Sequence, residues 1–363
     1  MEQLGIDAII GDKRAMMSKS GEMENFTVYE EERPISILQV LPCSIAVKER
    51  QTNIIGEDFG FSLVNMKKEN ASCVFHMMTR PDKGHLGLSD EVMYEALQQQ
   101  KEQERVLVYH NPENMQELVR YQQYGFAPVG DNFLFFRKKI ILSDEIITSC
   151  ILEDCVKIPG TEYVIKKLEE SEMQELVQFV NSELSIRYGV FAVRTVSYFE
   201  RILEMLAEYH GYMFVMKRQD KIVGYFSLED VFENEICREA FFIRDEIRDD
   251  FFETRKDCLP TLARVISLRN MVKHICCNGK VTIALRIADP MIRANNGTYL
   301  WFIDEKGSRL ELITTENSSL PGPELSVTIG EFTSILLGYK SMQKNKKFES
   351  MKLLGPAWLP ERK

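Results

Sequence analysis

The chain has 363 residues, of which 44% are hydrophobic and 28% charged, a composition typical of a globular protein with two or three domains. Its formal net charge of −10 argues against nucleic acid as the main ligand, because phosphate backbones are bound by clustered lysine and arginine. No apolar run approaches the roughly 20 residues of a membrane span, and the first residues lack the features of a signal peptide. We therefore expect a cytoplasmic protein with no membrane partner.

Apolar periodicity sharpens near residue 26 and predicts a set of antiparallel strands. The strand candidates are residues 26–29, 35–41 and 44–47, separated by charged turns such as 30–34. They lead into a further apolar strand at 73–78. The chain is therefore predicted to begin with an antiparallel sheet.

A turn with two glycines follows, over residues 81–87, and joins that strand to a helix. Ser89 and Asp90 offer an N-cap, and apolar residues at helical spacing predict a half-buried helix over 90–104. Such a turn collects unpaired N–H groups and the positive end of the helix dipole. It predicts an anion site, with pyrophosphate as its natural ligand.

A strand over residues 105–109 and a helix closed by Tyr121-Gln-Gln-Tyr-Gly-Phe complete the pattern. This order resembles the GNAT acyltransferase superfamily, whose acetyl-CoA loop reads roughly Pro-x-x-Arg-x-x-Gly-x-Gly/Ala. Gly84 stands where the family usually has Arg or Gln, so the loop lacks a charged donor, and Ser89 replaces a smaller residue. The resemblance implies that acetyl-CoA binds, as a substrate, to Met77, Met78, Thr79, Gly84, His85, Gly87, Leu88 and Ser89.

Tyr121 matches the family tyrosine that faces the thiol of acetyl-CoA. A phenol has a pKa near 10, close to that of a thiol, so it is a suitable general acid for a departing thiolate. The alternative is that Tyr121, Tyr124 and Phe126 are only core aromatic residues near a helix end.

A second cycle of similar elements follows a predicted closing strand at 133–136 and a turn at 157–160 that we interpret as a linker. We expect strands at 163–165, 212–216 and 222–227 and helices at 170–183 and 196–208. This region resembles half of a GNAT domain, but it has neither the glycine-rich turn nor a Tyr-Gly-Phe sequence. It is not expected to bind acetyl-CoA.

The third region begins near residue 259 and alternates over 281–290 and 297–303, which predicts antiparallel strands. Residues 324–339 change from a strand into a helix that ends at a glycine. The whole order resembles the Eis-like (enhanced intracellular survival type) N-acetyltransferases. The most specific matching segments are residues 263–266, 289–297 and 336–339.

This resemblance implies an α/β (α+β) fold of tandem GNAT domains followed by a sterol-carrier-protein-like α+β domain. The implied limits are 1–150 for a GNAT domain with a shortened N-terminus, 151–258 for a degenerate GNAT domain and 259–363 for the third domain. It also implies that the third domain acts as a scaffold and that the protein is a homo-oligomer.

The resemblance further implies an acetyl-CoA-dependent N-acetyltransferase that needs no metal. The acceptor would be a small amine of the aminoglycoside, polyamine or peptide type. Tyr121 would be the acid, and the carboxylate of Lys363 is the positional match for the base, with Glu361 or a water chain as alternatives. A non-catalytic relative that binds a small molecule or serves as a structural partner is the second hypothesis.

Eight cysteines are scattered along the chain without a Cys-x-x-Cys pair. Buried, reduced thiols are the favoured interpretation. Cys276 and Cys277 near His274 are the only arrangement that suggests a metal site, and adjacent cysteines without a second cluster seldom close a tetrahedral shell.

Overall fold

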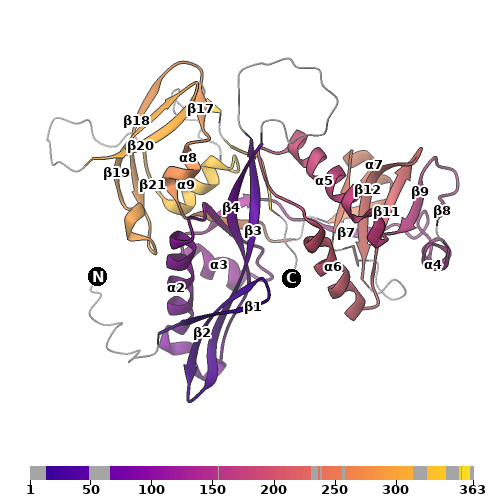
Figure 1. The fold of residues 1–363 in the computed structure, drawn as a ribbon, viewed down its shortest axis with the longest axis horizontal. Coiled ribbons are helices and arrows are strands. Elements are labelled where there is room, and N and C mark those ends of the chain that lie inside the picture. Colours follow the sequence, from indigo (N-terminus) through magenta and orange to yellow (C-terminus); the bar gives the residue numbers. More distant parts are fainter. Residues whose placement is uncertain are drawn as a thin grey trace.

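The computed structural model describes residues 14–48, 66–153, 155–229, 236–237, 239–255, 258–313, 325–340, 351–352 and 354–359. Glu361 and Lys363, the base candidates at the end of the chain, lie outside them. The described elements form three successive parts, coloured from indigo to yellow in Figure 1. The figure shows the third part above the first and the second part to its side.

The first part is built on a sheet to which nine described strands belong. Seven of them follow one another in the order β1-β2-β3-β4-β5-β16-β6. Their bounds are β1 Met16–Ser20, β2 Met23–Glu30, β3 Arg33–Lys48, β4 Met66–Thr79, β5 Leu107–His110, β6 Ala127–Gly130 and β16 Thr261–Val265. Two short strands, β10 (Val190–Ala192) and β23 (Ala357–Trp358), pair with each other, and β10 pairs with β3.

The strands predicted at 35–41 and 44–47 are one continuous strand, β3. Pro42 would weaken the middle of a sheet because it has no N–H group to donate. It is tolerated here because the β2 pairing of β3 ends at Val40 and the β10 pairing begins at Ile45. The proline therefore lies where one side of β3 has no partner strand among the described residues.

Two helices, α2 (Leu88–Glu102) and α3 (Met115–Gln123), cover one face of this sheet. The apolar spacing predicted for the first helix holds, since residues such as Val92 point into the cluster between helices and strands. The other face, which includes Tyr109, packs in one apolar cluster with the third part and its Trp301. The central strands are therefore buried on both sides.

The second part contains a five-stranded sheet in the order β14-β12-β11-β9-β8. The strands of this sheet are β8 Val156–Lys157, β9 Val164–Lys167, β11 Tyr212–Arg218, β12 Lys221–Leu228 and β14 Ala240–Phe242. The second part also contains β13 Ile236–Cys237 and β15 Phe252–Arg255, which belong to a separate sheet. Its helices are α4 Asp144–Leu152, η2 Glu170–Glu172, α5 Met173–Arg187, α6 Val196–Glu208 and α7 Asp245–Phe251. The segment interpreted as a linker is instead strand β8 and a turn to β9, in which Gly160 has a φ of 73°.

The strand predicted to close the first sheet belongs elsewhere. β7 (Leu134–Arg137) pairs with β13 and β15 of the second part, whereas β16 pairs with β5 and β6 in the first sheet. The apolar run at 133–136 predicted a strand here, but such a run carries no information on the partner strand. The predicted domain limits stay a prediction, and these two strands pair across them.

The third part contains a four-stranded sheet in the order β20-β19-β18-β21. Its elements are α8 Leu268–Val272, β17 Cys276–Cys277, β18 Val281–Ala288, η3 Arg293–Asn295, β19 Gly297–Asp304, β20 Gly307–Leu312, β21 Leu325–Thr328, α9 Ile329–Leu336 and β22 Met351–Lys352. A capping box between Thr328 and Glu331 starts α9. The predicted strand-to-helix change and the glycine after the helix are both present, since Gly338 has a φ of 75°.

Within the described residues, no helix is long and apolar enough to cross a membrane. All eight cysteines are free thiols, and Cys155 is exposed. Cys73, Cys150, Cys237, Cys276 and Cys277 are buried as expected, and Cys43 and Cys258 are half-buried.

The C-terminal strand β23 is held against the second part by a close backbone contact at Gly189. The Gly189 N–H donates to the Pro356 carbonyl at 3.0 Å. A Cβ atom at position 189 would lie 1.7 Å from the carbonyl oxygen of Leu354. The residue before β10 must therefore be a glycine for this strand to dock.

We expect Gly189→Ala to lower the free energy of unfolding by about 1–3 kcal/mol, because the methyl group forces the C-terminal segment away. Gly84→Ala is the matched control, since a Cβ there meets no atom within 4 Å, and its effect should stay within about 0.5 kcal/mol. Chemical denaturation of both variants measures the difference. Equal stabilities would contradict the docking described here.

Candidate functional site

The parallel pairing of β4 with β5 ends at Val74 and His110. β4 continues to Thr79, and it carries a bulge at this point, since Val74 pairs with Val40 and Met77 with Leu38 in β3. A bulge bends its strand away from the neighbouring strand. The backbone groups of β4 beyond the bulge therefore have no partner strand on the β5 side among the described residues.

Helix α3 places Tyr121 beside the end of this pairing. The side chain of Asn114 caps the helix by accepting the Glu117 N–H at 2.9 Å. The Tyr121 ring stacks on His110 with a centroid distance of 3.8 Å and an interplanar angle of 15°. The predicted acid is thus brought to the end of β5 by a correctly predicted helix.

The Tyr121 hydroxyl is buried and has no hydrogen-bond partner within the part of the chain that the structure describes. Burial raises its pKa well above the usual value of a tyrosine. An unpaired buried hydroxyl costs roughly 1–3 kcal/mol. Such a donor is retained without cost only if something outside the chain, such as a ligand atom, pairs with it. The same ring also packs with Tyr124 and Phe126, so Tyr121 is a core residue as well.

His110 is a candidate functional residue that the sequence analysis did not identify. Its Nδ1 lies 3.1 Å from the Val74 carbonyl oxygen, and its Nε2 lies 3.4 Å from a Glu117 carboxylate oxygen. Both ring nitrogens therefore face an oxygen acceptor. The signal available in the sequence was a histidine that ends a buried strand directly before an Asn-Pro turn.

The predicted glycine turn is a short 3-10 helix, Pro81–Leu86, followed by Gly87 with a φ of 67°. The helix α2 begins at Leu88 with Gly87 as its N-cap, so the predicted capping by Ser89 or Asp90 is wrong. Ser89 instead shares a 2.8 Å hydrogen bond with Thr79. The turn therefore sits on the end of β4 through side-chain contacts.

The residues of the predicted pyrophosphate site lie at the end of β4 and the start of α2. Gly84, His85 and Met78 are exposed, and the Leu88 side chain is buried, so only the backbone of this residue can face a ligand. Met77, Thr79, Gly87 and Ser89 are half-buried. The structure therefore brings the predicted set together at the C-terminal end of β4, an inner strand of the sheet.

The charges at this turn are mutually neutralised. Arg80 donates to both carboxylate oxygens of Asp82, at 2.6 and 2.7 Å, and Lys83 lies 2.9 Å from a carboxylate oxygen of Glu30. Asp90 and Glu91 add negative charge to the first turn of α2. A phosphate ligand would meet paired cations and acidic side chains at this helix start.

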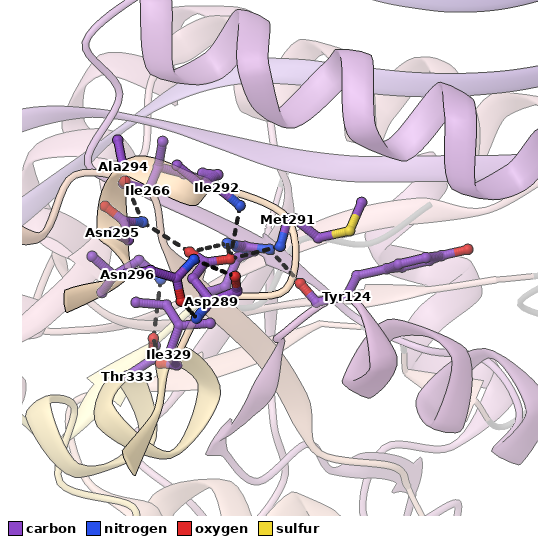
Figure 2. A network of polar contacts seen from close by, with 12 residues as sticks. Tyr124, Ile266, Asp289, Met291, Ile292, Ala294, Asn295, Asn296, Ile329 and Thr333 are labelled. Carbon is purple, nitrogen blue, oxygen red and sulfur yellow. Dashed lines mark hydrogen bonds and ion pairs between the residues drawn. The ribbon is translucent and has the colours of Figure 1, made fainter. Parts of the chain in front are cut away.

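The C-terminus of α3 is tied to the third part by a buried polar network (Figure 2). Arg264 donates to both oxygens of Asp289, at 2.8 and 2.7 Å, and to the carbonyl of Tyr124. The segments 263–266 and 289–297, which carried the family resemblance, thus meet in one ion pair.

A cavity of about 220 Å³ lies between the first and second parts. Its walls include Cys43 and Ser44 of β3 and Tyr198 and Arg201 of α6, together with Glu22. Glu22 lies in the short turn that joins β1 to β2. A further cavity of about 340 Å³ lies beside β23, and neither Tyr121 nor His110 lines either of the two cavities.

His274 and Cys277, considered above for a metal site, make hydrogen-bond contacts with other parts of the chain. His274 Nε2 lies 3.0 Å from a Glu69 carboxylate oxygen, and the Cys277 thiol donates to the Ile303 carbonyl. Among the described residues, no group of three potential metal ligands occurs.

Two tyrosine variants test the assignment of the unpaired hydroxyl. Tyr121→Phe should leave the free energy of unfolding of the ligand-free protein unchanged or raise it by about 1 kcal/mol, because it removes an unsatisfied group. Tyr124→Phe removes a hydroxyl that donates to Asp90 at 2.7 Å. This variant should lower the free energy of unfolding by about 1–2 kcal/mol. Denaturant titration compares them. A similar loss for both would mean that the Tyr121 hydroxyl is bonded.

Comparison with known proteins finds a family match for the third part and similar structures for nearly the whole chain. The family profile of the sterol carrier protein domain matches residues 262–357. No curated protein sequence matches the chain. A protein of Enterococcus faecalis described as a probable N-acyltransferase superposes with a TM-score of 0.62 at 14% identity, over 94% of this chain and 90% of its own.

Two further structures have the same organisation. A GCN5-related N-acetyltransferase from Anabaena variabilis gives a TM-score of 0.62 at 12% identity, over 93% of this chain and 89% of its own. Eis1 from Mycobacterium abscessus gives a TM-score of 0.56 at 9% identity, over 92% and 86%. The chain therefore has the same fold as these structures, Eis1 included, over more than nine-tenths of its length, and a sterol carrier protein domain matches within the region that the sequence analysis placed at 259–363.

Proposed function

We propose that this protein is an acyl-CoA-dependent N-acyltransferase whose acyl-donor site lies where the pairing of β4 with β5 ends. One observation carries the proposal. The β4 backbone beyond Val74, which has no partner strand on its β5 side among the described residues, and the buried, unpaired hydroxyl of Tyr121 lie at the same strand end. The first can hold a pantetheine arm as an added strand, and the second can donate to a sulfur atom.

In the proposed reaction, the amine nitrogen of the acceptor attacks the carbonyl carbon of acetyl-CoA. The carbon–sulfur bond breaks, its electron pair stays on sulfur, and Tyr121 donates its proton to the thiolate. Burial raises the pKa of Tyr121, but the same surroundings raise the pKa of a thiol. The two shifts act in the same direction.

The proton of the attacking amine needs a base. Lys363, predicted for this role, lies outside the described residues, and its role stays a prediction. The position of Leu359, near the C-terminus, supports this role. The carbonyl of Leu359 accepts a hydrogen bond at 3.4 Å from the side chain of Asn111, the residue that follows His110. His110 is excluded as a second base, because a base needs a lone pair directed at the amine and both of its ring nitrogens face protein oxygens.

The acceptor is proposed to bind in the cavity between the first part and α6. This cavity offers the hydroxyls of Ser44, Thr195 and Ser197 and the Glu22 carboxylate, which is paired with Arg201 of the same wall at 3.1 Å. A cationic amine would compete with that arginine for the carboxylate. The cavity volume of about 220 Å³ is below the roughly 300–1,000 Å³ of pockets for drug-sized ligands. It therefore suits the end of a polyamine or peptide better than a whole aminoglycoside.

A weakened relative that binds a small molecule without turnover is the second candidate function. The observation that favours it is the neutralised turn, in which Arg80 and Lys83 are each paired with a carboxylate and Gly84 replaces a charged donor. The homo-oligomeric state remains a prediction under either function.

Calorimetric titration with acetyl-CoA tests the donor site. We expect saturable binding, and we expect Tyr121→Phe to lower kcat with an almost unchanged dissociation constant for acetyl-CoA, because only a contact to the transition state is removed. Absence of heat at millimolar acetyl-CoA would reject the enzyme. Binding with an unchanged kcat in the variant would reject Tyr121 as the acid.

Restoring the missing cation should strengthen donor binding. Gly84 is exposed and a Cβ there meets no neighbour within 4 Å, so Gly84→Arg fits without strain. A new charge-assisted contact to the pyrophosphate is worth about 1.5 kcal/mol, or roughly tenfold in affinity. Gly84→Gln is the neutral control. If both variants bind acetyl-CoA as the natural protein does, the turn is not the pyrophosphate site.

A further inference from the structure

We propose that Arg264 is a positioning residue for the reaction. It fixes the C-terminus of α3, and with it Tyr121, to the sterol carrier protein domain. The inference rests on the proposed function for its kinetic consequence, whereas its structural consequence is measured separately.

The first observation is the network of hydrogen bonds that fixes Arg264 and Asp289. Its side chain is fully buried, and Asp289 holds it with two hydrogen bonds. Asp289 accepts in turn from the backbone N–H groups of Met291 and Ile292, both at 2.9 Å, and from the Asn295 side chain at 2.8 Å. Figure 2 shows Asp289 at the centre of these contacts. The acceptor that orients the guanidinium is therefore itself fixed.

The second observation is where a further donor group of Arg264 goes. It donates to the carbonyl of Tyr124, the C-cap residue of α3. The carbonyl of Tyr121, one turn earlier, accepts from the N–H groups of Tyr124 and Phe126 at 3.0 and 3.2 Å. The backbone that carries Tyr121 is therefore linked to Arg264 through one helical turn.

The third observation is the lack of space around this helix end. Gly125 has a φ of 84°, and a Cβ there would lie 2.7 Å from a methyl carbon of Ile329 and 3.4 Å from a guanidinium nitrogen of Arg264. Ile329 begins α9 of the third part. The C-terminus of α3 is thus confined by two residues from distant segments of the chain.

A guanidinium is required because it presents several donors in one rigid plane. It can bind a carboxylate with two of them and a carbonyl with another, whereas the single ammonium of lysine cannot keep this geometry. Lysine still pairs its charge with Asp289. Arg264→Lys therefore isolates the contact to Tyr124 from the buried charge.

Arg137 provides a matched control. It is also buried, and it also donates to a carboxylate, that of Asp144, and to a backbone carbonyl, that of Leu142. It lies on β7 in the second part. Arg137→Lys should cost stability in the same way without reaching α3.

The experiment compares Arg264→Lys with Arg137→Lys by steady-state kinetics and by hydrogen exchange of peptides from residues 115–126. Arg264→Lys should lower kcat by about tenfold or more, since a small displacement of a catalytic group is costly, and change KM for acetyl-CoA less than twofold. It should also speed exchange in α3. Arg137→Lys should change neither quantity beyond twofold.

Asn295→Ala is the second variant in case Arg264→Lys does not fold. It loosens Asp289 without leaving a buried charge, and about a threefold loss of kcat with faster α3 exchange is expected. The proposal is overturned if both folded variants leave α3 exchange unchanged, or if Arg264→Lys and Arg137→Lys reduce kcat equally. An inactive natural protein would reject the proposed function, whereas the exchange data would still decide the role of Arg264.

Discussion

The buried ion pair between Arg264 and Asp289 is the interaction on which the arrangement around the site depends. It joins a strand of the first sheet, the last turn of α3 and a loop of the third part. Buried ion pairs add little net stability compared with apolar packing, because desolvation offsets their attraction. They do penalise any other arrangement strongly, since an unpaired buried charge costs several kcal/mol. The pair therefore specifies how these three segments meet.

Strands that pair with a sheet of another part also specify how the parts meet. β16 completes the first sheet although it lies within the predicted third domain, and β7 joins the second part although it lies within the predicted first domain. The C-terminal β23 pairs with β10, which itself extends the first sheet. The first and second parts are thus each completed by residues from another part. A site at their junction can be held without long loops, because rigid strands deliver its residues.

The candidate site combines two regions of different character. At the end of β5, the hydroxyl of Tyr121 is buried and unpaired, and His110 and Glu117 lie beside it, which are features of a site with a task beyond packing. At the turn before α2, the cations are paired and the first helical turn is acidic. The proposed chemistry is therefore better supported than the binding of a phosphate.

The sequence by itself determined most of the elements and the order of the parts. Helix α6 was predicted with its observed limits, and Tyr121 was placed correctly on a helix after a buried strand, because periodicity and capping act over a few residues. Tertiary structure alone decided the partner of β7, the meeting of His110 with Glu117 and Val74, and the contact from Arg264 to Tyr124. The last joins residues 140 positions apart, and no local pattern encodes such a contact.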